Sequence, residues 1–279
     1  MAIRNSLSDH EKVMLYEIVR DLTTFAIEGK QNRAGRLAYN FGEFLTFLNQ
    51  HRPAIKMFRL ACELDPDYAT KGYLFEQAGG NLFRKGRYTA ASFAYVRVLR
   101  MERVRNPSVF LLFAESQLMR GRTGSAFFWS EVGLASKAIS DDERLPAFMA
   151  LNHAVKILRF QTGSTRVHRK TLAARELTES SMSMSDENAI GVLEKAVTLD
   201  PMDCEIWFLL GQRLNEMGER EKTVRALFLS SVLSNGNLDN WLNLILVAFT
   251  SRVSPNHLAL FLSAAGVYGY DHLAELARE

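Results

Sequence analysis

The chain has 279 residues, of which 47% are apolar and 23% are charged. This composition is typical of a folded protein and excludes disorder throughout the chain. The formal net charge of +3 is below what a dedicated nucleic-acid binder usually carries.

Helices dominate the expected secondary structure. Only six prolines occur, and the proline-free stretches 9 to 28 and 34 to 50 show no β-branched alternation, so we expect an all-α protein. The most apolar run, 241 to 249, is about half as long as a membrane-spanning helix requires. The first residues lack the order of a secretory signal, and Cys62 and Cys204 have neither disulfide nor metal-ligand spacing. We therefore expect a cytoplasmic protein.

The first predicted element is a helix over 9 to 28. Ser8 and Glu11 have the spacing of a capping box, and five apolar residues fall on one face. These residues are Leu15, Ile18, Val19, Leu22 and Phe25. We expect 1–30 to form an N-terminal capping helix.

Two later helices end with the same signal. LACELDP at 60 to 66 reappears as KAVTLDP at 195 to 201, and the proline prevents each helix from continuing. Small and large apolar residues recur at fixed spacing around these endings. In chain order they are Phe41, Gly42, Leu45, Ala54, Phe58, Ala61 and Pro66; Phe75, Ala78, Gly79, Leu82, Gly86, Tyr88, Ala91, Tyr95 and Val98; Phe110, Phe113, Ala114, Gly121, Ala126 and Gly133; Ala189, Leu193, Ala196 and Pro201; Trp207, Leu210, Gly211, Leu214 and Gly218; and Trp241 and Leu244.

This spacing resembles the tetratricopeptide repeat (TPR), a unit of two antiparallel helices. The resemblance implies a right-handed α-solenoid of TPR helix-turn-helix repeats with N- and C-terminal capping helices. After 1–30, we expect three repeats over 31–140, a helix of a fourth repeat over 141–162, a polar insertion or linker over 163–186, and C-terminal repeats with a cap over 187–279. The helix at 141 to 162 opens with Ser140 and Glu143 in capping-box spacing.

The small residues have two expected roles. Gly86, Gly121 and Gly218 suit the turn between two helices, where a left-handed backbone is needed. The other small residues allow close approach of the helix axes, so we expect them at helix contacts. They are Gly42, Ala54, Ala61, Gly79, Ala91 and Gly211.

The segment 163 to 186 is too long for a TPR turn. A basic first half and a Ser/Met-rich second half leave three alternatives: a mobile linker, a short extra helix at 170 to 178, or a segment that orders on binding. We expect it to be the most mobile interior part of the chain.

No catalytic or metal-binding pattern is visible. The six histidines are isolated from one another and from cysteine, and GRTGS at 121 to 125 lacks the lysine and strand context of a phosphate loop. We therefore expect no cofactor, no metal and no enzymatic activity. Basic residues gather around the second repeat, either as a solvated outer face or as a surface for an acidic partner or nucleic acid. They are Arg84, Lys85, Arg87, Arg97, Arg100, Arg103 and Arg105.

The resemblance also implies a concave groove lined by the first helix of each repeat. The candidate partner-binding residues are Tyr39, Asn40, Glu43, Phe47, Tyr73, Gln77, Phe83, Arg84, Glu115, Phe208, Gln212 and Asn215. Tyr39, Phe47, Tyr73 and Phe83 are expected to anchor a protein segment, or else to pack against another part of the chain. TPR proteins that hold acidic C-terminal peptides use an asparagine and lysine clamp, but Glu43, Gly80 and Glu115 stand at the asparagine positions.

These observations favour a non-enzymatic TPR adaptor or scaffold that binds a protein or peptide in its concave groove and assembles a multiprotein complex. One alternative is a TPR chaperone that shields an aggregation-prone or secreted partner. A second alternative is a nucleic-acid-associated factor that uses the arginine-rich surface.

Overall fold

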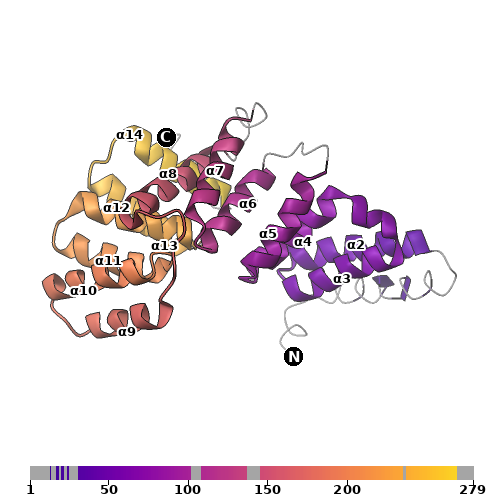
Figure 1. Cartoon of the computed structure of the whole chain (residues 1–279), viewed down its shortest axis with the longest axis horizontal. Coiled ribbons are helices and arrows are strands. Elements are labelled where there is room, and N and C mark those ends of the chain that lie inside the picture. Colours follow the sequence, from indigo (N-terminus) through magenta and orange to yellow (C-terminus); the bar gives the residue numbers. More distant parts are fainter. Residues whose placement is uncertain are drawn as a thin grey trace. The chain divides into compact units, whose positions relative to one another are not determined.

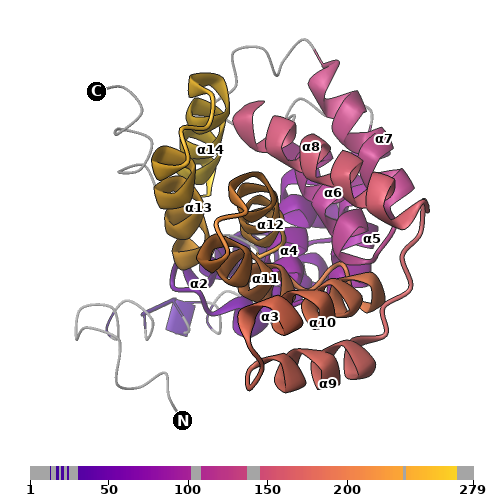
Figure 2. The same ribbon diagram turned by 90° about the vertical axis from the view of Figure 1, so that its left-hand side faces the viewer.

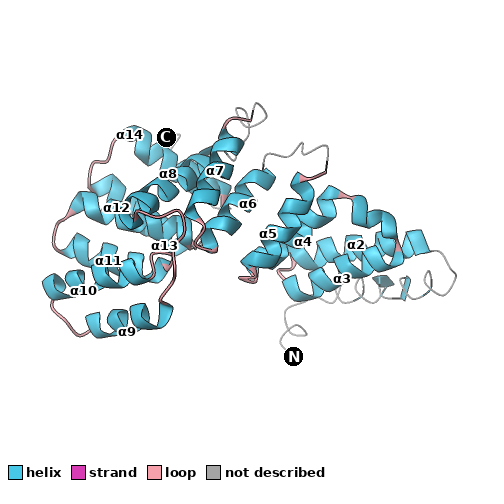
Figure 3. Ribbon diagram, in the orientation of Figure 1, coloured by secondary structure: helices cyan, strands magenta, loops and turns pink. Residues whose placement is uncertain are grey.

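The computed structural model describes residues 31–101, 108–136, 145–234 and 237–268, together with a few residues between 13 and 24 (Figure 1). In these ranges it contains thirteen α-helices, one 3-10 helix and no strand (Figure 3). The all-α prediction is therefore confirmed. The chain divides into two compact units, residues 1–104 and 105–279.

Within residues 31–101, unit 1 contains two helix hairpins. The first pairs α2 (Gln31–Phe47) with α3 (His51–Leu64), and the second pairs α4 (Gly72–Arg84) with α5 (Tyr88–Leu99). A 3-10 helix, η2 (Pro66–Thr70), joins them. Asp65 begins η2 by accepting a hydrogen bond from the backbone N–H of Asp67 at 3.1 Å. The first LDP therefore ends one hairpin and starts the connection to the next.

Small residues allow the helices of each hairpin to approach closely. A Cβ placed on Gly42 would lie 2.6 Å from a ring carbon of Phe58, and one on Gly79 would lie 2.6 Å from a ring carbon of Tyr95. Each glycine thus faces the large residue of its partner helix. A Cβ on Gly211 would similarly lie 2.8 Å from Leu227, and the three alanines of the set are fully buried, so the predicted close contacts are confirmed.

The hairpin turns use left-handed backbone. Gly86, Gly121 and Gly218 have φ angles of 68°, 70° and 75°, as predicted for the turn positions. The turn between α2 and α3 has Asn49 at φ 57° instead. Asparagine tolerates this region better than other side chains do.

Replacing Gly86 with alanine is expected to lower the free energy of unfolding by about 1 kcal/mol, because a Cβ in the left-handed region strains the backbone. A Cβ on Gly86 would meet no other atom within 4 Å, so the change isolates this backbone effect. Asn49→Gly is the matched control and should leave stability unchanged or slightly higher. Urea unfolding followed by circular dichroism measures both, and equal effects would contradict the turn assignment.

Unit 2 contains nine helices within the residues that the structure describes. They are α6 (Ser108–Met119), α7 (Thr123–Leu134), α8 (Leu145–Thr162), α9 (Thr171–Ser181), α10 (Asp186–Leu199), α11 (Cys204–Glu216), α12 (Arg220–Leu233), α13 (Leu238–Thr250) and α14 (Pro255–Val267). Consecutive helices pack as α6 with α7, α9 with α10, α11 with α12, and α13 with α14.

The remaining helix, α8, buries one side against unit 2 and leaves Met149, His153 and Phe160 exposed on the other. It packs against α7, α12 and α14, and α14 lies beside it in Figure 2. Its apolar residues Phe148, Leu151, Val155 and Leu158 are all fully buried. It packs on α7 and α6 as α4 packs on α3 and α2, so the assignment of 141–162 as a helix of a fourth repeat stays a prediction. The helix that pairs with α10 is α9.

The aspartate of the second Leu-Asp-Pro segment, Asp200, explains why α10 pairs with α9. Asp200 is fully buried and accepts hydrogen bonds from Arg169 Nε at 2.7 Å and from the Thr171 hydroxyl at 3.0 Å. In the first repeat, a Cβ placed on Gly35 would lie 2.6 Å from the Cβ of Asp65. In both repeats the aspartate that ends the second helix thus packs against the start of the first helix, which is α2 in one case and α9 in the other.

The residues before α9 are hydrogen bonded at both ends. Val167 N–H donates to the Gly121 carbonyl at 2.7 Å, and Gly124 N–H donates to the Thr165 carbonyl at 2.9 Å. Lys170 N–H donates to the Leu199 carbonyl at 2.9 Å. Of the three alternatives for 163–186, the structure contains the short extra helix, α9, and the mobility of the segment stays a prediction.

Several sequence-based predictions fall outside the described residues. Most of the capping helix over 1–30 does, as do the capping-box residues Ser140 and Glu143 and the chain after 268. The described residues 17, 18, 20, 21 and 24 are helical, and Ile18 packs against the core of unit 1. No helix among the described residues has the length and apolar character needed to cross a membrane.

Candidate interaction surfaces

The first helices of the two repeats in unit 1 lie side by side and run parallel. The rings of Tyr39 and Tyr73 meet edge to face with 5.1 Å between centroids. Two turns further along, Asn81 Nδ2 donates to the Thr46 hydroxyl at 2.8 Å. This register places three predicted residues of α2 beside three of α4, and we call this set the α2–α4 face. It consists of Asn40, Glu43, Phe47, Tyr73, Gln77 and Arg84.

The aromatic residues predicted as anchors divide into two pairs. Phe47 and Tyr73 are exposed, with 81% and 47% of their surface accessible. Tyr39 and Phe83 are buried, because Tyr39 stacks on Tyr68 at 5.5 Å and Phe83 packs against Tyr88 at 5.1 Å. Of the two expected roles, Tyr39 and Phe83 therefore have packing within the chain, whereas the anchor role of Phe47 and Tyr73 stays a prediction.

A buried hydroxyl fixes the carboxylate of the α2–α4 face. The Tyr39 hydroxyl donates to Glu43 Oε1 at 2.6 Å. Burial, followed by this hydrogen bond and by the charge of Glu43, raises the pKa of Tyr39 far above its usual value. Burial and the charges of Glu43 and Asp65 also raise the pKa of Tyr73. Both hydroxyls therefore stay protonated near neutral pH, and Glu43 is held in a defined position.

A buried polar network holds the two helices in register. His51 Nδ1 and Asn81 Oδ1 are 2.8 Å apart, and Asn81 Nδ2 also donates to the Gln77 carbonyl at 2.9 Å. The Thr46 hydroxyl, which Asn81 contacts, donates to the Gly42 carbonyl at 2.9 Å. Sequence reasoning missed this network, although a lone asparagine among the apolar residues of a helix was a signal for it.

Replacing Asn81 with alanine is expected to lower the free energy of unfolding by about 2 kcal/mol, because His51 and Thr46 lose a buried partner. Asn40→Ala, on the exposed α2–α4 face, is the control and should change stability by less than about 0.5 kcal/mol. Urea unfolding gives both values. A loss no larger than the control's would show that the network does not hold α2 against α4.

In unit 2, the predicted groove residue Glu115 is engaged within the chain. The Tyr268 hydroxyl, at the end of α14, donates to Glu115 Oε1 at 2.8 Å. Burial raises the pKa of Glu115 to about 7, and the hydrogen bond from Tyr268 opposes part of this rise. The Tyr268 ring stacks on buried Trp241 at 5.7 Å. Glu115 therefore fastens α6 to the end of α14, so it is not free to meet a partner as predicted.

The other predicted residues of unit 2 lie on α11. Gln212 and Asn215 are exposed, whereas Phe208 is half-buried against the core.

The predicted basic surface around the second repeat is also divided. The Arg97 guanidinium lies 4.3 Å from the centre of the Phe75 ring and donates to the Ala69 carbonyl, so this side chain makes its contacts within unit 1. Four of the other basic residues are exposed, and two lie outside the described residues. They are Arg84, Lys85, Arg87 and Arg100, and Arg103 and Arg105, respectively.

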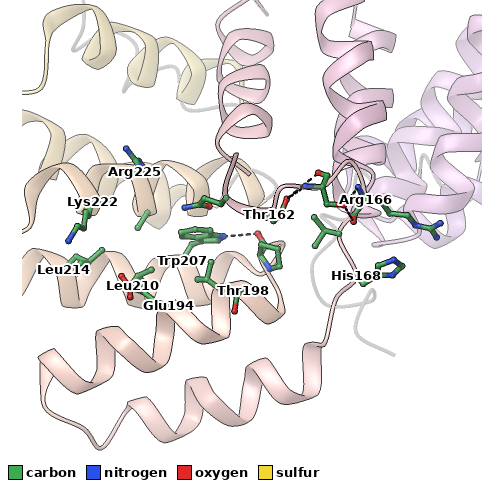
Figure 4. Close-up of a pocket in the computed structure, with 16 residues that line it drawn as sticks. Thr162, Arg166, His168, Glu194, Thr198, Trp207, Leu210, Leu214, Lys222 and Arg225 are labelled. Atoms are coloured by element: carbon green, nitrogen blue, oxygen red, sulfur yellow. Dashed lines mark hydrogen bonds between the residues drawn. The ribbon is translucent and has the colours of Figure 1, made fainter. Parts of the chain in front are cut away.

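Unit 2 also contains a cavity of about 620 Å³. Its walls come from α10, α11, α12, the end of α8 and residues 164–168 (Figure 4). Trp207 lies in its middle and donates from Nε1 to the Pro201 carbonyl at 2.9 Å. Among the described residues, no group of three histidine, cysteine, aspartate or glutamate side chains is placed to hold a metal ion.

Residues 35–68, which span the first hairpin, match the family model described as tetratricopeptide repeat. No match was found among curated proteins. Similar solved structures include the TPR2AB domain of yeast Sti1 in a complex with pHSP90, which is 11% identical with a TM-score of 0.37, and the match covers 88% of this chain and 99% of that one.

Two further structures show the same level of likeness. The anaphase-promoting complex assembly Cut9–Hcn1 is 14% identical with a TM-score of 0.43, and the match covers 95% of this chain and 46% of that one. PilF of Pseudomonas aeruginosa is 14% identical with a TM-score of 0.40, with 89% and 98% covered. The match over 35–68 shows a tetratricopeptide repeat in the first hairpin, and the repeated hairpins with their small-residue contacts give the described part of the chain the fold of a TPR-type α-solenoid.

Proposed function

We propose that this protein is a non-enzymatic scaffold of the cytoplasm that binds a protein segment on its α2–α4 face and holds it in a larger assembly. The observation that carries this proposal is the exposure of Phe47 and Tyr73 at the two ends of a polar strip. A TPR fold supports a role in protein interaction, because its repeats position side chains on a rigid framework.

The geometry of the α2–α4 face favours an extended segment. Phe47 lies eight residues beyond Tyr39, which touches Tyr73, so the two exposed aromatics are about 12 Å apart along the helix axis. Four residues of an extended chain cover this distance. Aromatic side chains bury a large area at low cost in side-chain entropy, so they suit the anchor positions. Glu43 and Gln77 would then set the register of the backbone between them.

A general chaperone for aggregation-prone proteins is the alternative. Such a role requires a continuous apolar surface. On the α2–α4 face, Asn40, Glu43 and Arg84 are exposed around the two aromatics. This mixture favours recognition of a particular sequence over general shielding.

The double variant Phe47→Ala, Tyr73→Ala tests this proposal. We expect it to weaken binding of the partner, identified by affinity purification from the host cells and mass spectrometry, by roughly 10-fold to 100-fold. Both side chains are exposed, so the helical circular dichroism should remain that of the original protein. The control is Phe93→Ala, which removes a 70% exposed aromatic from α5. Equal affinity of the double variant and the control would exclude this face as the binding site.

A further inference from the structure

The cavity in unit 2 exists because the chain departs from regular repeat stacking. Residues 163–170 cross from the end of α8 to the start of α9, and their hydrogen bonds to Gly121, Gly124 and Leu199 fix them in place. The crossing segment stands opposite α10, α11 and α12 and closes one side of the cavity (Figure 4). The cavity walls also include the second helices of two repeats, α10 and α12, so this site is separate from a groove lined by first helices.

The middle of the cavity is apolar. Trp207, Leu210 and Leu214 follow one another along one side of α11, and Val197 and Ala226 come from the flanking helices. The indole N–H of Trp207 is already bonded to the Pro201 carbonyl, and the residue is 3% exposed, so a small apolar part of its ring faces the cavity. A volume of about 620 Å³ lies within the usual range of ligand sites.

Cationic side chains stand at both ends of this apolar middle. Figure 4 shows Lys222 and Arg225 toward one end and Arg166 toward the other, with Trp207 between them. Glu194 is the only carboxylate that lines the cavity among the described residues. The lining therefore carries an excess of positive charge at two separated places.

The cations at the two ends have only weak partners or none in the described part of the chain. Lys222 pairs with Glu219 at 3.2 Å and Arg225 with Glu221 at 3.5 Å, both at exposed positions where ion pairs contribute little. No ion pair of Arg166 is present among the described residues. The pKa of Arg120 is lowered chiefly by burial and further by the charges of Arg122 and Arg166. Several cations therefore lie close together at the Arg166 end of the cavity.

We propose that this cavity binds an extended peptide segment of a partner protein in which an apolar side chain packs on Trp207 and acidic side chains on either side meet the two cationic ends. The charge of the lining identifies an anionic occupant, and the separation of the two ends favours an elongated one. The site belongs to unit 2 and shares no residue with the α2–α4 face. It is thus independent of the proposed function of unit 1.

The test uses fluorescence anisotropy with three labelled decapeptides. The first has a Leu-Phe centre flanked by acidic residues, the second has the same centre flanked by lysines, and the third has a Gly-Gly centre flanked by acidic residues. The full chain should bind the first peptide at least tenfold more tightly than either of the others. Binding should weaken as salt is raised, because the ends recognise charge.

Two variants with the same change of charge locate the site. Arg166→Glu should weaken binding of the acidic Leu-Phe peptide roughly tenfold or more. Lys195→Glu changes an exposed residue of α10 that does not line the cavity, and it should leave the affinity unchanged. Thr198→Trp, which places a large ring in the cavity, should also weaken binding, while thermal unfolding confirms that each variant is folded.

Three results would overturn the proposal. One is the absence of binding of the acidic Leu-Phe peptide by the original protein at millimolar concentration. Another is equal affinity of Arg166→Glu and Lys195→Glu. The third is that single-stranded polyuridylate binds more tightly than the acidic Leu-Phe peptide and that Arg166→Glu weakens this binding to the same extent. That result would assign the cationic ends to nucleic acid instead.

Discussion

Replacing Arg169 with alanine is expected to lower the free energy of unfolding of unit 2 by about 3 to 5 kcal/mol. Arg169 Nε lies 2.7 Å and 3.0 Å from the two carboxylate oxygens of Asp200, which has no accessible surface. Without the guanidinium, a buried carboxylate keeps only the Thr171 hydroxyl and the Met202 N–H as partners. The loss of stability in Arg169→Ala is the free-energy cost of leaving the Asp200 charge buried without a cation. It therefore exceeds the net contribution of the Arg169–Asp200 ion pair to stability.

The two sides of this ion pair should respond differently. Asp200→Asn removes the buried charge and keeps an acceptor for Thr171, and the Arg169 side chain, 34% exposed, can return to water. We therefore expect this variant to cost about half as much as Arg169→Ala. Lys170→Ala, at the neighbouring exposed position, is the control for both. Urea unfolding of the three variants gives the comparison, and an Arg169→Ala value equal to that of Lys170→Ala would show that the pair does not hold α9 on α10.

Raising the pH from 4.5 to 7 should destabilise unit 2 through Glu115. Its pKa rises from 4.5 to about 7 on folding, chiefly because the carboxyl is buried, so the folded state binds a proton that the unfolded state releases. The stabilising effect is complete below about pH 4.5 and is lost as pH rises through about 7. The total change is at most about 3 kcal/mol.

Glu115→Gln tests this dependence. A neutral amide oxygen still accepts the hydrogen bond from Tyr268, so the fastening of α6 to α14 is retained without a buried charge. We expect the variant to unfold at a higher urea concentration than the original protein at pH 8, and the two to be nearly equal at pH 4.5. Glu176→Gln, at an exposed position of α9, is the control. Parallel stability curves for the original protein and Glu115→Gln across this range would contradict the assignment.

Features that depend on neighbouring residues in the sequence were predicted well. The contact of Gly42 with Phe58, and of Gly79 with Tyr95, follows from the fixed spacing within one helix hairpin. The left-handed turns at Gly86, Gly121 and Gly218 are likewise properties of a few residues each. Local spacing determines these contacts because a short turn leaves two consecutive helices few ways to pack.

Features that depend on distant contacts were not predictable in this way. The hydrogen bond between Glu115 and Tyr268 joins residues 153 positions apart, so the spacing of the third repeat alone marked Glu115 as a free groove residue. The pairing of α10 with α9 instead of α8 depends on Arg169 and Thr171 reaching Asp200. Periodicity could not decide between the two roles expected for Tyr39, because it does not predict that Tyr68 of η2 covers the ring.

The most direct test of the proposed function is photo-crosslinking from within the α2–α4 face. The photoreactive amino acid p-benzoylphenylalanine replaces Phe47 on α2 in one sample and Phe93 on α5 in another, both highly exposed in the isolated chain. After irradiation in the host cells, position 47 should yield a discrete covalent product with a partner protein, and the product should be absent when Tyr73 is changed to alanine. Position 93 should yield no such product. The same product from both positions, or a product only from position 93, would contradict binding at the α2–α4 face.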